Sequence, residues 1–148
     1  MTKIIQTTIT IKASPSEVWA ILTEFDKYPN WNPFIKSITG QAKVGSILIA
    51  KIQPPESKEM TFKPRVHVSD ENEELKWKGK LLFKGLFDGE HQFLISDNGD
   101  GTVSFEQNEK FTGLLVKILP SSMFKNTESG FKEMNAKLKI EAEKKGQY

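Results

Sequence analysis

The sequence predicts an α+β fold in which a curved antiparallel sheet of about seven strands wraps around a long C-terminal helix. Three observations predict it. The first residues alternate apolar and polar side chains, residues 35–112 read as strands separated by turn residues, and the last third has apolar side chains at helical spacing. A sheet and a helix with one apolar face each need a packing partner. The length of 148 residues suits one domain, so we expect 1–148 to be a single unit.

The chain begins with a predicted strand and a well-specified helix start. The strand is indicated by apolar positions that alternate with polar ones at Ile5, Thr7, Ile9 and Ile11. Ser14 and Glu17 have the spacing of a capping box, and Pro15 occupies the first helical position. We therefore expect a helix to begin directly after Ser14.

A second short helix is predicted in the aromatic segment 28–34. The first helix should end by Lys27, because Pro29 disfavours helical geometry at Tyr28. The segment itself contains two prolines and three aromatic residues, which favours a short helical turn before the next strand. The prediction is thus two short helices after the first strand.

Six further strands are predicted between residues 35 and 112. Short turns rich in glycine, asparagine and aspartate separate them, which favours an antiparallel meander over parallel crossovers. The predicted strands are 35–42, 46–53, 59–69, 73–83, 89–97 and 102–112.

The last third of the chain predicts one long helix. Its apolar stripe is spaced three and four residues apart and comprises Phe124, Thr127, Phe131, Met134, Leu138 and Glu141. Pro120 separates this main helix, at about 121–145, from a short first helical turn containing Leu114, Leu115, Ile118 and Leu119.

Composition excludes several classes of protein. The chain has no cysteine, so a disulfide scaffold, a thiolate zinc site and a cysteine nucleophile are excluded. The net charge is only +2 and Arg65 is the single arginine among 21 basic residues, which argues against nucleic-acid binding. We find no signal peptide and no apolar run long enough for a membrane span, and we expect a soluble, cytoplasmic protein.

Four segments of the sequence resemble the START-like, or SRPBCC, superfamily, and most closely its bacterial polyketide cyclase/dehydrase-like proteins. They lie along essentially the whole chain, at 13–19, 28–34, 89–93 and 105–115. The resemblance implies a helix-grip fold with an elongated hydrophobic cavity between sheet and C-terminal helix. Members bind lipids, sterols, plant hormones or polyketides, some catalyse cyclisation or aromatisation, and others bind protein partners.

The alternation within strands places three polar side chains on the concave, apolar face. His91 has the parity of the apolar positions in 89–97, and Gln107 and Glu109 have that parity in 102–112. A buried glutamate without a partner is costly or becomes protonated, and a nearby histidine could satisfy it. The cluster fits a structural polar network, a set of groups that orients a ligand, or a general acid and base.

Other candidate residues are mostly aromatic. The predicted ligand-binding set is Trp31, Phe34, Trp77, His91, Phe93, Gln107, Glu109, Phe111, Phe124 and Phe131. No metal site is predicted, because the spacing of typical ligand pairs is absent and His67 has outward parity. Arg65 and the row Lys76, Lys78 and Lys80 are also expected to face outward.

An apolar turn stands out between two predicted strands. Leu86 and Phe87 follow Lys84 and Gly85, where apolar side chains are unexpected. They could cap the mouth of a cavity, contact a membrane transiently during ligand uptake, or pack on a neighbouring loop.

The leading functional hypothesis is a non-catalytic module that binds or transports a hydrophobic small molecule such as a lipid or polyketide. The first alternative is a polyketide-type cyclase, aromatase or dehydratase in which His91 and Glu109 move protons. The second is a protein-interaction module on the same fold, which a cavity filled by phenylalanine side chains would favour. We expect no cofactor, and a monomer or a dimer.

Overall fold

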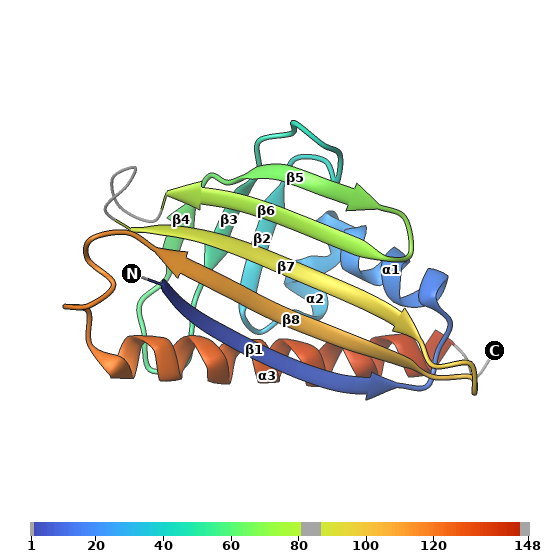
Figure 1. Cartoon of the computed structure of the whole chain (residues 1–148). Helices are drawn as coiled ribbons and strands as arrows, with labels where there is room; N and C mark the ends of the chain where they lie inside the picture. Colours follow the sequence, from blue (N-terminus) through green and yellow to red (C-terminus); the bar gives the residue numbers. More distant parts are fainter. Residues whose placement is uncertain (1, 81–86, 146–148) are drawn as a thin grey trace.

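Five antiparallel strands form the large sheet of the computed structural model, which describes residues 2–80 and 87–145. Figure 1 shows this sheet with the C-terminal helix running along it. In spatial order the strands are β1 (Thr2–Ile11), β8 (Val103–Thr112), β7 (Asp88–Asp97), β6 (Glu74–Lys80) and β5 (Arg65–Asp70). Neighbouring strands are antiparallel throughout, as the short turns predict.

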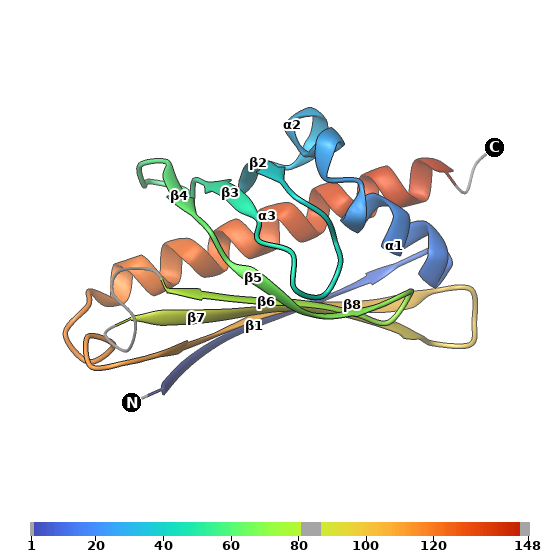
Figure 2. The ribbon, with the colours of Figure 1, turned by 90° about the horizontal axis from the view of Figure 1, so that it is seen from above.

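A smaller sheet faces the large one. Its strands lie in the order β2 (Ile35–Thr39), β3 (Ile49–Ile52) and β4 (Met60–Phe62). Seen from above, the large sheet and the small sheet lie on opposite sides of α3 (Ser121–Lys145) (Figure 2). Backbone hydrogen bonds join the two sheets, from Leu48 to Pro64 (2.8 Å) and from Val66 to Ser46 (2.9 Å). The predicted helix-grip fold is confirmed.

The N-terminal helices begin as predicted, but Pro29 is not what ends the first of them. The Ser14 hydroxyl accepts a hydrogen bond from the Glu17 N–H (3.2 Å) and the Glu17 carboxylate accepts one from the Ser14 N–H (3.1 Å), which starts α1 (Pro15–Thr23). A 3-10 turn at Phe25–Lys27 leads directly into α2 (Tyr28–Trp31). Tyr28 is helical despite the following proline, because Pro29 lies in the first turn, where its missing N–H costs nothing.

The predicted strand 59–69 is two strands that belong to different sheets. Pro64 has no N–H to donate, and the chain passes from β4 to β5 around it. A register shift between Val66 and Val68 then places Val68 opposite Lys76, on the outer face, whereas Val66 lies opposite Trp77 on the inner face. One extra residue is enough to reverse a strand's side-chain parity.

The long helix has the predicted range, and turns without a regular helix precede it at the predicted place. Residues 114–119 make successive turns, and Leu114 and Ile118 are exposed. Along α3, Phe124, Phe131, Met134 and Leu138 are buried against the sheets. Within the residues that the structure describes, no helix is long and apolar enough to span a bilayer.

Candidate functional site

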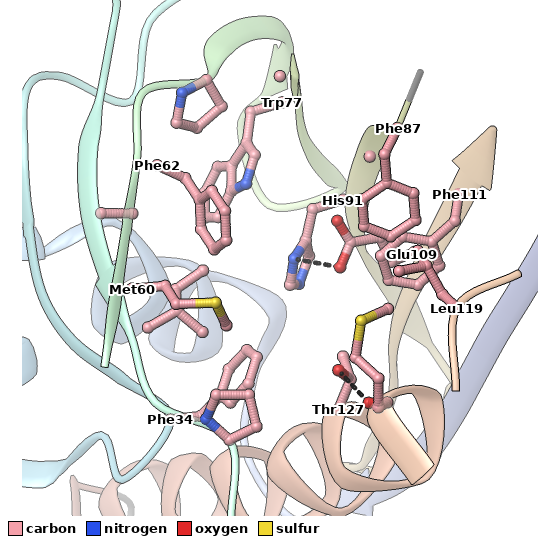
Figure 3. Close-up of a pocket in the computed structure, with 17 residues that line it drawn as sticks. Phe34, Met60, Phe62, Trp77, Phe87, His91, Glu109, Phe111, Leu119 and Thr127 are labelled. Carbon is pink, nitrogen blue, oxygen red and sulfur yellow. Dashed lines mark hydrogen bonds and ion pairs between the residues drawn. The ribbon is translucent and has the colours of Figure 1, made fainter. Parts of the chain in front are cut away.

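A cavity of about 230 Å³ lies between the large sheet, the small sheet and the first half of α3. Figure 3 shows the side chains that line it converging from all three elements. Aromatic rings make up much of its wall, from Phe34 before β2, Phe62 on β4, Trp77 on β6, Phe87 before β7 and Phe111 on β8. Such a wall suits an apolar ligand body.

His91 and Glu109 bring polar groups into this apolar surface. They are direct cross-strand neighbours on β7 and β8, and their side chains point toward one another in Figure 3. The His91 Nδ1 and Glu109 Oε1 atoms are 3.7 Å apart, which is longer than a hydrogen bond. Both side chains are buried, with 2% and 12% of their surface exposed. Thr127 on α3 also lines the cavity, but its hydroxyl donates to the Met123 carbonyl.

A chain of hydrogen bonds behind His91 fixes the orientation of its ring. The Thr7 hydroxyl donates to the Gln107 backbone carbonyl (2.8 Å), so it accepts from the Asn135 amide nitrogen (2.8 Å). The Asn135 amide oxygen therefore accepts from Gln107 Nε2 (2.7 Å), which leaves Gln107 Oε1 facing His91 Nε2 at 2.9 Å. An amide oxygen can only accept, so His91 Nε2 carries the proton.

The tautomer of His91 follows from this chain and from burial. Burial lowers the pKa of His91 to about 4, so the ring is neutral near pH 7 and has a single N–H. Because that N–H is on Nε2, the Nδ1 atom toward Glu109 has a free lone pair. Burial also raises the pKa of Glu109 to about 8, so this carboxyl is mostly protonated near pH 7. The pair thus presents one acceptor and one donor.

The structure brings half of the predicted ligand-binding residues to the cavity wall. Those that line it are Phe34, Trp77, His91, Glu109 and Phe111. Four of the other five contact the wall from behind, and Trp31 lies apart from it beside Tyr28.

Gln107 is one of these supporting residues, and it holds His91 in place. The remaining four pack on other rings. Phe131 lies edge-to-face with Phe34, and its ring centroid is 4.9 Å from that of His91. The ring centroid of Phe93 is 4.6 Å from that of His91. Phe124 packs on Phe111, and Trp31 packs on Tyr28 near α2.

Of the three alternatives for the apolar turn, the position of Phe87 at the cavity agrees with the first. Phe87 is buried and stacks on Phe111 with their ring centroids 5.5 Å apart and their planes nearly parallel. Its side chain lines the cavity, so it is not presented on the surface. Leu86 lies outside the described residues.

Asn135, Thr7 and much of the small sheet's contribution to the cavity were not among the predicted site residues. Thr7 has inward parity in β1, and Asn135 lies four residues after Phe131 and three before Leu138, within the buried stripe. A buried amide at that position could have signalled a polar network. No local pattern brings Ile52 and Met60 to the cavity, because the small sheet is positioned by its long-range contacts.

The described residues contain no group of three or more metal-ligating side chains. His67 is exposed in β5, and the exposed Arg65 donates to the Gly45 carbonyl (2.9 Å). Lys78 and Lys80 are exposed on the outer face of β6, while Lys76 is half-buried there and lies 3.6 Å from Glu90. These cationic and imidazole side chains are not among the residues that line the cavity.

A family model described as polyketide cyclase / dehydrase and lipid transport matches residues 2–143. A comparison with curated proteins gives no match.

Solved structures show the same fold at low sequence identity. The di-domain aromatase/cyclase StfQ from the steffimycin biosynthetic pathway has a TM-score of 0.80 at 12% identity; the match covers 100% of this chain and 53% of StfQ. A START superfamily protein from Mycobacterium smegmatis has a TM-score of 0.75 at 19% identity, over 95% and 97% of the two chains. The ZhuI aromatase/cyclase from Streptomyces sp. R1128 has a TM-score of 0.77 at 12% identity, over 97% and 94%.

Proposed function

Because the chain belongs to the family of polyketide cyclases/dehydrases and lipid-transport proteins, we propose that it binds and carries a hydrophobic small molecule in the cavity described above. The observation that carries this proposal is an apolar cavity of about 230 Å³, lined in part by aromatic rings, in which His91 and Glu109 supply the ionisable groups among the described residues. A mostly apolar wall with a few converging polar groups is typical of small-molecule sites. The ligand would be a lipid, a polyketide or a molecule of similar character.

Within this proposal the lining residues have different roles. Phe34, Trp77 and Phe111 contact the apolar body of the ligand, and His91 and Glu109 bind its polar group. The predicted residues behind the wall keep these side chains in place. Gln107 does so through its hydrogen bond to His91, and Phe93, Phe124 and Phe131 do so by packing on His91, Phe111 and Phe34. Trp31 packs on Tyr28 and has no role in this proposal.

Native mass spectrometry tests the proposal directly. The purified protein is expected to retain an adduct, or to acquire one from a panel of lipids and aromatic polyketides. The variant Ile52→Trp places a larger side chain in the cavity and should weaken binding at least about tenfold, whereas Ile140→Trp makes the same change on an exposed face of α3. A protein that neither retains nor acquires any ligand contradicts the proposal.

The pairing of a free Nδ1 lone pair with a protonated carboxyl favours a second candidate function, a dehydratase or cyclase. In a dehydration, His91 Nδ1 would take a proton from the carbon beside a carbonyl while Glu109 gives its proton to the departing hydroxyl, which leaves as water. Proton transfer from His91 back to Glu109 then returns the imidazole to its neutral form and the carboxyl to its protonated form.

Turnover of a β-hydroxy ketone tests this alternative. Glu109→Gln keeps the size of the side chain and removes the acid, so it should lower the rate at least about 100-fold. His91→Ala should abolish turnover while the fold is retained, as judged by circular dichroism. If Glu109→Gln keeps its rate, or if His91→Ala loses only stability, the catalytic role is wrong.

The protein-interaction alternative predicts that the chain's own phenylalanine side chains fill the cavity. Phe93, Phe124 and Phe131 are buried, but they lie behind the wall and leave the volume open. This observation supports the small-molecule proposal over that alternative.

A further inference from the structure

We infer that the cavity selects a hydrophobic ligand that carries an uncharged hydroxyl group, and that it discriminates against a carboxylate or an ammonium group at the same position. The inference rests on the proposed function, which it deepens by naming the ligand class. It is carried by the geometry of His91 and Glu109 and by the absence of cationic side chains from the described part of the cavity wall.

The hydrogen-bond chain behind His91 has a fixed direction. It runs from the Gln107 backbone carbonyl through Thr7, Asn135 and the Gln107 amide to His91, and every donor in it is fixed by the carbonyl at its start. His91 therefore presents its unprotonated Nδ1 atom to the cavity as an acceptor. Moving the ring proton from Nε2 to Nδ1 would leave the Gln107 amide oxygen without a donor.

The spacing of His91 and Glu109 leaves room for a bridging atom. The His91 Nδ1 and Glu109 Oε1 atoms are 3.7 Å apart, too far for a direct hydrogen bond. A third atom can lie within about 2.8 Å of both and bridge them. A hydroxyl oxygen suits this position, because it donates its proton to Nδ1 and accepts one from the protonated carboxyl.

The described part of the cavity wall has no cationic side chain. Among the described residues that line it there is no lysine or arginine, so a carboxylate would find no counter-ion among them. Burying an ionised carboxylate in such surroundings is costly, and the ligand would have to bind in its protonated form. An ammonium group would require Glu109 to ionise beside aromatic rings.

The pKa directions agree with this geometry. Burial raises the pKa of Glu109 and lowers that of His91, so both are uncharged near pH 7. A neutral donor and a neutral acceptor match a neutral hydroxyl better than either kind of ion.

A set of matched probes tests the inference at pH 7. Naphthalene, 2-naphthol, 2-naphthoate and 2-naphthylmethylammonium share one aromatic body, and 1-decanol and decanoate repeat the comparison with an aliphatic body. Dissociation constants are measured by calorimetry or native mass spectrometry. We expect 2-naphthol to bind roughly 3- to 10-fold more tightly than naphthalene. We expect each carboxylate to bind on the order of 100-fold more weakly than its hydroxyl partner, which reflects the fraction that is protonated at pH 7.

Two variants connect the preference to Glu109. Glu109→Leu removes the donor but keeps an apolar side chain, so naphthalene should still bind and the advantage of 2-naphthol should disappear. Glu106→Leu makes the same change at a half-buried position of opposite parity in β8 and should leave the preference unchanged. Long-range proton–nitrogen NMR spectra should show His91 protonated at Nε2 and not at Nδ1 in the free protein.

The outcomes separate the two proposals. If none of these probes binds and the lipid and polyketide panel also fails, the proposed function is wrong and this inference falls with it. If naphthalene binds as tightly as 2-naphthol, or if a carboxylate or the ammonium probe binds more tightly, the inference alone is overturned. Retention of the hydroxyl preference in Glu109→Leu would also overturn it.

Discussion

Glu109 and His91 are held uncharged by their surroundings, and this is the chief electrostatic feature at the scale of single residues. Strand alternation turns both into the apolar interior, where ionisation is unfavourable for each. An ion pair between them would require a proton to move from Glu109 to His91, against both pKa shifts. The neutral pair keeps its hydrogen-bonding capacity for a ligand.

The stability of the protein should fall between about pH 6.5 and 8 because of Glu109. Its pKa rises from 4.5 in the unfolded chain to about 8 in the folded one, so in this range the folded state holds a proton that the unfolded state has released. Between pH 4.5 and 6.5 the opposite shift of His91, from 6.5 to about 4, offsets this slope. Above pH 6.5 the effect of Glu109 outweighs the fading effect of His91, and the expected loss of stability is about 1 kcal/mol by pH 8.

Urea unfolding at several pH values between 6.5 and 8 measures this loss. Glu109→Gln has no titrating carboxyl and should show a much flatter profile, whereas Glu106→Gln, on the same strand with opposite parity, should keep the slope of the natural protein. A Glu109→Gln profile as steep as that of the natural protein would show that another group causes the loss.

At the scale of elements, the approach of α3 to the cavity depends on Gly130. A Cβ atom at this position would lie 2.4 Å from Cδ1 and 2.7 Å from Cε1 of Phe34. Phe34 is buried and lies edge-to-face with Phe131 of α3, so its ring could move away only toward the cavity and with loss of this packing. The glycine lowers the helix propensity of α3 but lets the helix lie directly against the cavity wall.

Gly130→Ala should therefore destabilise the fold, although alanine is the better helix former. The gain in propensity of up to about 1 kcal/mol is outweighed by overpacking that costs about 1–3 kcal/mol. In a Phe34→Leu background the same change should become neutral or stabilising. Urea denaturation of the four proteins in this double-mutant cycle measures the coupling, and equal effects of Gly130→Ala in both backgrounds would contradict it.

At the scale of the whole molecule, the cavity belongs to several elements at once. The two sheets are joined where the segment 45–48 pairs with 64–66, and α3 packs against β1 and β8 of the large sheet and contacts α2 beside the small one. Residues from both sheets and from α3 line the cavity. A ligand bound there would contact most of the fold and stabilise it as one unit.

Thermal unfolding with and without ligand tests whether the two sheets and α3 unfold as one cooperative unit. The protein should unfold in one transition, and a ligand at 100 times its dissociation constant should stabilise it by about 2.7 kcal/mol without splitting that transition. Calorimetry gives both quantities. Two resolved transitions, with only one of them shifted by ligand, would show that the sheets unfold separately and that 1–148 is not a single cooperative domain.

Much of the fold could be predicted from the sequence because its signals are local. The capping box at Ser14 begins α1, the apolar stripe from Phe124 to Leu138 gives α3 its range, and alternation in β7 and β8 turns His91, Gln107 and Glu109 inward. The errors arose where a single residue overrides a local pattern. Pro64 divides one predicted strand between two sheets, and the bulge after Val66 reverses the parity of Val68.

The sequence by itself determined the fold class, the family resemblance and the inward orientation of the polar pair, because periodicity and capping act over a few residues. The tertiary structure decided which aromatic side chains line the cavity and which support it, that Phe87 is buried, and that Thr7 and Asn135 orient His91. The bond between Asn135 and Thr7 joins residues 128 positions apart. The free volume and the direction of the hydrogen-bond chain depend on such distant contacts, which no local pattern encodes.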